Sequence, residues 1–269
     1  MSHEDRNARE QAFHDEWASS LRVEDVLVDE SWSAATCPEH RWFRSHLGEL
    51  KGKRVLDLGC GAGEAAVWFA KNGADVVASD LSPQFLDLVQ RLAAAHHTTL
   101  TTHLGDADTV TLPLASFDIV YAGNLLHHVD LNKTLDQILL LLKPGGVVLT
   151  WDPLKHNPAI SVYRRMAGGV RTADEHPLSV RDVEAFRRRF PQVEYECFWF
   201  TTLWIFMRFY LIEGVHPSKE RYWKKIVTEH ERLTPLYNRL DRLDRWLFRY
   251  LPFLKRYGWT IAVRAVKAA

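Results

Sequence analysis

The chain has 269 residues, with 34 Lys and Arg balanced by 34 Asp and Glu, and it is 46% hydrophobic and 25% charged. This is the composition of an ordinary globular protein, and the balanced charge argues against nucleic acid as a partner. The three cysteines, Cys37, Cys60 and Cys197, form no CxxC pair. Their spacing argues against a disulfide framework or a structural zinc site and favours a reducing, cytoplasmic compartment. The charged N-terminal stretch is not expected to be a signal peptide, and no apolar run predicts a membrane span.

Two helices are predicted first, at residues 5–20 and 39–50, with Phe13 and Trp17 on one face of the first. Strand and helix patterns then alternate. The predicted strands are Lys53–Leu58, Asp75–Ser79, Thr99–His103, Phe117–Tyr121 and Gly146–Trp151, and the helices between them are 63–72, 83–96 and 131–142. Apolar runs such as VVAS and DIVY are typical of strands that are covered on both faces. The alternation therefore predicts an α/β fold with a doubly wound, Rossmann-like parallel sheet.

The last third of the chain is less regular. A helix is predicted at 179–190, followed by a strand at Gln192–Phe200 and a closing strand at 257–266. The helical, aromatic and basic segment between these strands, about 55 residues, is far longer than an ordinary connection, so we predict an insertion. The predicted organisation has three parts: an N-terminal helical cap (1–50), a main domain (51–200 with 257–269) and the insertion (201–256).

A glycine-rich loop, DLGCGAGE at 57–64, follows the first strand and opens a helix, as a nucleotide-binding loop does. It lacks the Gly-Lys-Ser/Thr sequence that holds phosphates and Mg²⁺. A dinucleotide fingerprint needs glycine where Glu64 stands, and a carboxylate at a helix N-terminus repels pyrophosphate. For the loop alone, a glycine turn that merely lets the helix pack on the strand remains an alternative.

Polar residues also follow the next strands. Asp80 ends the second strand about twenty residues after the loop, where a carboxylate accepts hydrogen bonds from ribose hydroxyls. Taken alone, Asp80 could instead cap the next helix, which opens at Ser82-Pro83. Asp106 follows the third strand and Asn124 the fourth. In an open α/β sheet these positions meet at one edge, where ligands bind.

Together with LKPGG at 142–146, these motifs over roughly 50–152 resemble class I S-adenosylmethionine-dependent methyltransferases. The chain looks most similar to the small-molecule type that includes the ubiquinone and menaquinone methyltransferases. The resemblance implies S-adenosylmethionine as cofactor and a seven-stranded sheet whose last strand is antiparallel. The segment 257–266 fits that last strand.

The resemblance also implies a role for each motif residue. Gly59, Gly61 and Gly63 would let the backbone approach the methionine part of the cofactor, which Asp57 would help to fix. Asp80 would hold the ribose hydroxyls. The remaining contacts would come from Leu81 on the adenine face, Asp106 and Ala107 at the adenine amino group, and Asn124 at the ammonium group.

Methyl transfer needs mainly in-line positioning, and a base only where the acceptor loses a proton. His127 and His128 follow the fourth strand and are the candidate bases, because histidine titrates near neutral pH. The alternative is that this pair caps and packs a helix or touches the cofactor. No metal-ligand set is apparent, so no metal is predicted.

The acceptor is expected to lie under three segments: the N-terminal residues, the residues after the fifth strand, and the insertion. The candidate lining residues are Phe13, Trp17, Trp32, Tyr163, His176, Trp199 and Trp204. Residues 198–212 are aromatic and aliphatic, and residues 219–256 carry 11 Lys and Arg against 5 Asp and Glu. Such a segment can rest on a membrane, form a lid or make a dimer face. Each reading favours an apolar small-molecule or lipid-like acceptor.

Two other functions compete with methyl transfer. An NAD(P)-dependent oxidoreductase is disfavoured by Glu64 and by the lack of a Tyr-x-x-x-Lys pair. A cofactor-binding partner subunit without catalysis is disfavoured because the sequence has the expected residue at every cofactor-binding position. Calorimetry with S-adenosylhomocysteine and with NADH distinguishes the methyltransferase from the oxidoreductase.

Overall fold

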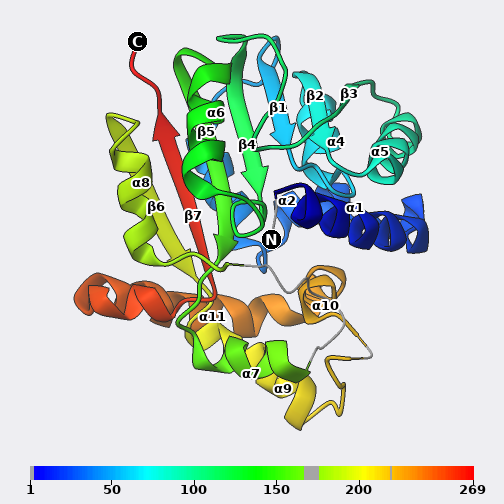
Figure 1. Ribbon diagram of the computed structural model, residues 1–269. Coiled ribbons are helices and arrows are strands. Elements are labelled where there is room, and N and C mark those ends of the chain that lie inside the picture. The colour runs from blue at the N-terminus through cyan, green and yellow to red at the C-terminus, as the bar shows by residue number, and fades with distance from the viewer. Residues whose placement is uncertain (1–2, 167–175, 219) are drawn as a thin grey trace.

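The computed structural model describes residues 3–166, 176–218 and 220–269. Its centre is a seven-stranded sheet in the order β3-β2-β1-β4-β5-β7-β6 (Figure 1). The strands are β1 (Arg54–Leu58), β2 (Asp75–Asp80), β3 (Thr101–Leu104), β4 (Phe117–Gly123), β5 (Leu142–Pro153), β6 (Gln192–Phe198) and β7 (Thr260–Val266). Strands β1 to β5 pair in parallel, and β7 lies antiparallel between β5 and β6. The predicted Rossmann-like sheet with an antiparallel last strand is confirmed.

The order in which the chain adds strands to the sheet reverses at β1. The chain moves from β1 to β2 and β3 on one side, then returns to β4 on the other side of β1. Asp57 of β1 stands opposite Ala78 of β2 and Tyr121 of β4. Loops at the carboxyl ends diverge at such a switch point and leave a crevice, which is where this fold binds ligands.

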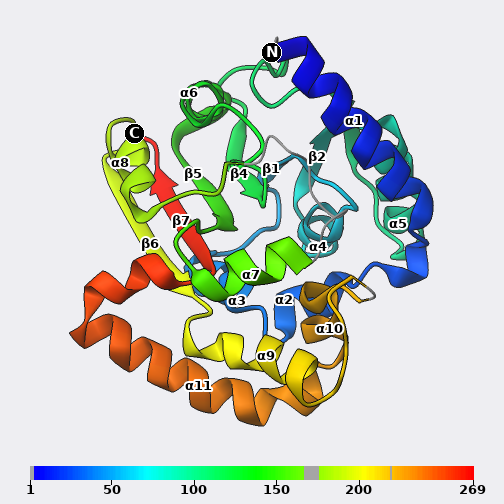
Figure 2. The same cartoon turned by 60° about the horizontal axis from the view of Figure 1, so that its bottom comes forward.

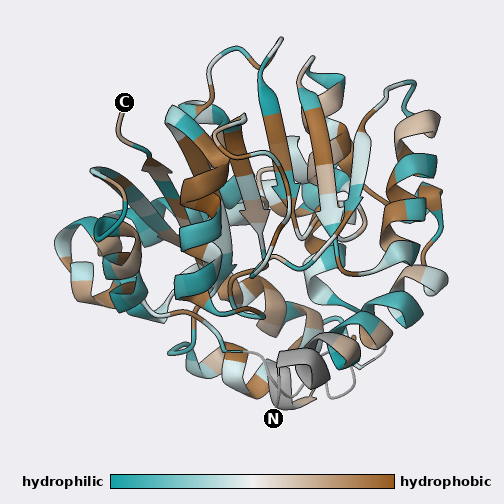
Figure 3. Ribbon diagram, turned by 45° about the horizontal axis from the view of Figure 1, so that its top comes forward, coloured by the Kyte–Doolittle hydropathy of each residue, from teal (hydrophilic) through white to brown (hydrophobic). Residues whose placement is uncertain are grey.

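Helices cover both faces of the sheet because the strand side chains alternate. Val55 packs in one core with α3 (Pro38–His46) and α4 (Glu64–Lys71). Its neighbour Leu56 packs in the other core with α6 (Leu131–Leu141) and α8 (Val183–Arg187). Figure 3 shows the hydrophobic residues concentrated in the strands and the hydrophilic ones on the outer sides of the helices.

The predicted helices agree with the structure to within a few residues. Helix α1 spans His3–Ser20 and α5 spans Pro83–Ala95. The backbone N–H of Phe85 donates to Ser82 Oγ at 3.1 Å, so Ser82 rather than Asp80 caps α5. The predicted helix 39–50 is shorter, because α3 ends at His46 and an extended segment leads to β1. The predicted helix 179–190 is only the short α8, preceded by a 3-10 turn.

The insertion leaves the sheet between β6 and β7 and folds beneath the carboxyl ends of the parallel strands (Figures 1 and 2). It contains α9 (Trp204–Leu211), α10 (Tyr222–Thr228) and α11 (His230–Tyr250). These helices share a hydrophobic cluster with α7 (Pro158–Met166), which follows β5. No helix within the described ranges is both long and apolar enough to cross a membrane.

Candidate active site

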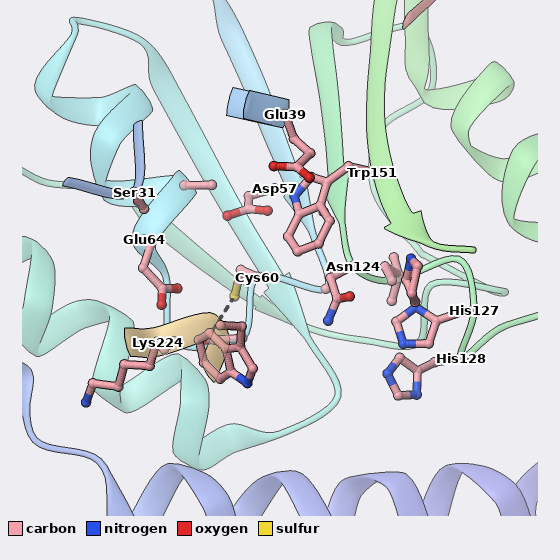
Figure 4. Close-up of a pocket in the computed structure, with 18 of the residues that line it drawn as sticks. Ser31, Glu39, Asp57, Cys60, Glu64, Asn124, His127, His128, Trp151 and Lys224 are labelled. Atoms are coloured by element: carbon pink, nitrogen blue, oxygen red, sulfur yellow. Dashed lines mark hydrogen bonds between the residues drawn. The ribbon is translucent and has the colours of Figure 1, made fainter. Parts of the chain in front are cut away.

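A cavity of about 460 Å³ opens at the switch point. The ends of β1, β2 and β4 form one wall, and α1, α7 and the insertion supply the other. It collects most of the predicted cofactor residues, namely Asp57, Gly59, Gly61, Asp80, Leu81, Asp106, Ala107 and Asn124. Figure 4 shows Asn124 standing between Cys60 of the glycine loop and the two histidines. The structure thus brings residues from four separate motifs to one place.

The three glycines of the loop have different tasks, although each has positive φ. A Cβ on Gly59 would lie 2.7 Å from Leu125 Cδ1, and one on Gly63 would lie 2.6 Å from Val89 Cγ2. These two positions need glycine because neighbouring side chains fill the space. A Cβ on Gly61 would meet nothing within 4 Å, so its backbone faces open space. Gly63 does not line the cavity, and its visible role is to let α4 pack against α5.

Asp80 holds the loop in place. Its Oδ2 accepts a hydrogen bond from the backbone N–H of Gly61 at 2.9 Å, and its Oδ1 accepts one from that of Ser82 at 2.9 Å. Burial raises the pKa of Asp80, and these two N–H groups oppose that shift. The side chain therefore fixes the loop backbone while it lines the cavity.

Asp57 is only 1% exposed, and burial raises its pKa to about 8. Its Oδ2 has no hydrogen-bond partner within the described part of the chain. A buried carboxylate oxygen without a partner is costly unless a donor or a cation meets it. Glu64, at the start of α4, also lines the cavity, and burial raises its pKa as well. This end of the cavity therefore suits a ligand that carries a positive charge.

Asn124 adopts a left-handed conformation, with φ of 56°, immediately after β4. Its backbone N–H donates to the carbonyl of Trp151 at 2.6 Å, which ties this turn to β5. Asparagine tolerates positive φ better than most residues, so the turn places its amide at the cavity wall.

The first histidine forms a buried pair with Asp152 at the end of β5. His127 Nδ1 lies 2.9 Å from Asp152 Oδ1, which also accepts the backbone N–H of His127 at 3.1 Å. Because a carboxylate accepts hydrogen bonds, this contact places the imidazole proton on Nδ1 and leaves the lone pair on Nε2. Burial raises the pKa of Asp152. The carbonyl of His127 accepts the backbone N–H of His176 at 2.7 Å.

The second histidine meets the N-terminal helix. His128 Nδ1 lies 3.3 Å from Glu10 Oε2, and its ring centroid is 5.9 Å from that of His14. Glu10 and His14 are one turn apart on α1, which crosses the cavity. The sequence analysis missed Glu10, although its spacing from His14, Phe13 and Trp17 places all four on one helix face.

The aromatic candidates divide into two groups. Phe13, Trp17, Tyr163 and Trp199 line the cavity, whereas Trp32, His176 and Trp204 do not. Trp32 is 1% exposed and stacks on Trp68 with ring centroids 3.9 Å apart, so it belongs to the core. Trp204 is 46% exposed on the outer side of α9, and His176 is also exposed. The amphipathic pattern did not reveal which side of each helix faces the cavity.

A hydrogen-bonded network supports the wall behind Asp57. His40 Nδ1 lies 2.7 Å from the carbonyl of Ser31, and its Nε2 lies 2.8 Å from the hydroxyl of Tyr121. That hydroxyl also accepts from Trp151 Nε1 at 2.8 Å. Since the carbonyl can only accept, Nδ1 carries the proton and Tyr121 donates to Nε2. Burial lowers the pKa of His40 to about 4, in agreement with a neutral ring.

Helix α10 contributes a second set of lining residues that sequence reasoning did not find: Arg221, Trp223, Lys224, Ile226 and Val227. The sequence showed only that this part of the insertion is basic and aromatic. Which of its residues face inward depends on how α10 packs against α2 (Val28–Ser33) and α11. No pattern within the segment reports that packing.

Known proteins match both the sequence and the fold. Residues 55–146 match the family model of a methyltransferase domain. A ubiquinone biosynthesis O-methyltransferase of Coxiella burnetii is 36% identical over 98 residues, which cover 36% of this chain and 42% of that protein. The demethylmenaquinone methyltransferase of Clavibacter sepedonicus is 32% identical over 161 residues, covering 57% of this chain and 61% of that protein.

The fold extends the similarity beyond the matched segment. A solved S-adenosylmethionine-dependent methyltransferase from Mesorhizobium loti has a TM-score of 0.55 at 24% identity, covering 87% of this chain and 99% of that one. The chain spans less than half the length of the first curated relatives that it matches, 42% in the Coxiella protein. The sheet order, the glycine loop and these matches define the class. The chain contains a methyltransferase domain over residues 55–146 and is similar in fold to the class I methyltransferases, whose cofactor is S-adenosylmethionine. Within that class it is similar to proteins named as ubiquinone and menaquinone methyltransferases.

Proposed function

We propose that this protein transfers a methyl group from S-adenosylmethionine to an apolar small-molecule or lipid-like acceptor. The observation that supports this function best is the shared cavity. Motif residues at the strand ends form one wall, and aromatic residues from α1, α7 and the insertion form the other. A cofactor and a second, apolar molecule can therefore meet within one enclosure.

The cofactor half fits the chemistry of S-adenosylmethionine. Asp57, with its unpartnered Oδ2, would receive the ammonium group, and the open backbone at Gly61 would admit the methionine part. Asp80 would hold the ribose, and Asn124 would offer its side-chain carbonyl to the ammonium group. When bound, the cofactor supplies a methyl group made electrophilic by the sulfonium.

His127 is the proposed base for an acceptor that loses a proton. Asp152 holds the ring in one orientation and one tautomer, so that Nε2 can accept the proton. His128, bound to Glu10, would instead join α1 to this wall of the cavity. The three segments that close the cavity would exclude water and align the acceptor with the methyl group. In-line transfer depends on this alignment more than on acid–base chemistry.

Calorimetry with S-adenosylhomocysteine and, separately, NADH tests the cofactor. We expect S-adenosylhomocysteine to bind and NADH to give no heat of binding. Transfer of a labelled methyl group from S-adenosylmethionine to a lipid extract then tests the reaction. Binding without transfer to any component of the extract would support the non-catalytic alternative, and NADH binding alone would support the oxidoreductase.

We further propose that α11 rests on an anionic membrane surface. Its exposed face carries Leu243, Trp246 and Tyr250 between Arg239, Arg242 and Arg249. Of the arginines from 239 to 249, only Arg245 has a carboxylate partner among the described residues, Asp241 at 2.8 Å. Exposed aromatic rings with unpaired cations match the interface between lipid headgroups and acyl chains.

The opposite face of α11 anchors the helix to the rest of the fold. Asp244 accepts the backbone N–H of Thr201 at 2.7 Å and the hydroxyl of Thr202 at 2.8 Å. Flotation with anionic and with neutral vesicles tests the proposal. We expect binding to anionic vesicles only, lost in Trp246→Ser combined with Arg242→Gln and retained in the surface control Arg188→Gln. A concentration-dependent dimer without vesicle binding would assign this face to a second copy instead.

A further inference from the structure

The charges that line the cavity are strongly unequal. Seven carboxylates line it: Glu10, Asp25, Glu39, Asp57, Glu64, Asp80 and Asp106. Among the described lining residues, the only lysine and arginine are Arg221 and Lys224, and both come from the start of α10. Carboxylates stabilise nearby cations, so the informative question is whether each of these two cations meets one.

The two cations have different surroundings. Lys224 Nζ lies 4.0 Å from Asp25 Oδ1, and its charge opposes part of the rise that burial causes in the pKa of Glu64, which opens α4 beside the glycine loop. Arg221 has no carboxylate oxygen within 4.0 Å and no side-chain hydrogen bond among the described residues. Lys224 is therefore associated with the cofactor half of the cavity, and Arg221 is not.

Arg221 lies between two tryptophans from different segments. Its Cζ is 4.7 Å from the ring centroid of Trp17 on α1 and 6.0 Å from that of Trp223 on α10. A guanidinium over an aromatic ring uses its face for that contact and keeps its in-plane N–H donors for a planar acceptor group. Tyr163 of α7 is a further titratable neighbour of Arg221, and burial raises the pKa of its phenol, which keeps it neutral.

Burial makes the charge of Arg221 costly. The side chain is partly buried, and this burial lowers its pKa from the ordinary value without neutralising it. Stacking offsets only part of the lost hydration, because the N–H donors at the edge of the guanidinium have no acceptor among the residues that the structure describes. An oxyanion presented at that edge would form two parallel, charge-assisted hydrogen bonds.

We propose that Arg221 binds a carboxylate group of the methyl acceptor. This assignment rests on the proposed function and deepens it, because the acceptor becomes an amphiphile with an apolar body and an anionic end. The apolar body would lie against the aromatic wall of α1 and α7, and the anionic end would lie between Trp17 and Trp223. The carboxylate of the cofactor itself is the second source of the same chemistry, and the experiment separates the two.

Dodecanoate and dodecanol are matched probes that differ in the anionic end. Calorimetry is performed on protein saturated with S-adenosylhomocysteine. We expect the wild type to bind dodecanoate about tenfold more tightly than dodecanol, and Arg221→Gln to lose that preference. Arg188→Gln, an exposed arginine outside the cavity lining, should retain it. Arg221→Lys keeps the positive charge but loses the paired N–H donors of the guanidinium, and it should retain part of the preference for dodecanoate.

The cofactor arm compares S-adenosylhomocysteine with its decarboxylated analogue. If Arg221→Gln weakens only the carboxylated ligand, the anion is that of the cofactor and the acceptor assignment is overturned. The assignment is also overturned if the wild type shows no preference for dodecanoate, or if folded Arg221→Gln retains it. If the wild type does not bind S-adenosylhomocysteine at all, the proposed function is contradicted instead. The two failures are therefore distinguishable.

Discussion

The two walls of the cavity are built in different ways. The wall proposed to bind the cofactor, the cofactor wall, comes from short loops that follow β1, β2 and β4, and much of it is backbone held in place, as Asp80 holds Gly61. The wall proposed to bind the acceptor, the acceptor wall, comes from side chains of α1, α7 and α10, three segments that are far apart in the chain. The first wall is fixed by the sheet, and the second by the packing of helices on one another.

This difference predicts that the two walls can be altered independently. Strand ends are anchored on both sides by neighbouring strands, so the loops between them keep their positions. Two helices of the acceptor wall, α7 and α10, pack in a separate cluster around Phe206, Phe209 and Tyr222, and α1 packs in another cluster with α5. Changes in the two walls should therefore have separable effects on cofactor and acceptor.

The largest expected effect is on transfer itself. His127→Gln keeps the size of the side chain and a donor toward Asp152 but removes the base. We expect kcat to fall about a hundredfold, with binding of S-adenosylhomocysteine unchanged within about twofold. The rate is measured with the acceptor identified in the labelled-methyl assay. An unchanged kcat would show that the pair is structural.

Asp80→Ala should affect the cofactor wall alone and so weaken cofactor binding. The change removes the acceptor for the backbone N–H groups of Gly61 and Ser82 and the proposed ribose contact. We expect affinity for S-adenosylhomocysteine to fall at least about tenfold in calorimetry. Asp75→Ala, at the exposed start of the same strand, is the matched control and should bind normally. Equal affinity of both variants would remove the ribose assignment.

Cofactor affinity should also depend on pH, through the titration of Asp57, and this effect should be smaller than that of Asp80→Ala. Its pKa is raised to about 8, so below that pH the unliganded protein carries a proton there, which an incoming ammonium group must displace. Affinity for S-adenosylhomocysteine should therefore rise between pH 6.5 and 8, by up to about tenfold per pH unit. Asp57→Asn should flatten this rise. A wild-type profile that is already flat would contradict the ammonium contact.

The smallest effect is expected at the outer boundary of the acceptor wall. Trp204 was predicted to line the site but is largely exposed. Trp204→Ala should change the free energy of unfolding by less than about 0.5 kcal/mol and leave S-adenosylhomocysteine binding unaltered. Chemical denaturation and calorimetry measure the two quantities. A large loss of stability would mean that the outer side of α9 is covered in solution.

Much of the cofactor wall could be predicted from the sequence. The glycine loop, Asp80 and Asn124 follow predicted strands, and parallel strands bring their carboxyl ends to one edge. The order of elements was equally accessible, because apolar runs and helical periodicity are local properties. Gly63 is the partial exception: its need for glycine comes from Val89 on α5, which the loop sequence does not reveal.

The acceptor wall depended on contacts that no local pattern contains. The pairing of His127 with Asp152, the contact of Glu10 with His128 and the stacking of Arg221 on Trp17 join residues from separate elements. Periodicity shows that a helix has an apolar face, but not which neighbour covers that face. Trp32 and Trp199 therefore looked alike in the sequence; packing buries both, and only Trp199 also lines the cavity.

The sequence by itself determined the strands, the helices and the residues at the strand ends, since apolar runs and glycine turns are local patterns. The strand order and the switch point at β1 came from the structure. Only the tertiary structure decided which side chains of the cap and the insertion face the acceptor. The physical reason is that helix orientation is set by burial of apolar area against distant elements, as α10 is set by its contacts with α2 and α11.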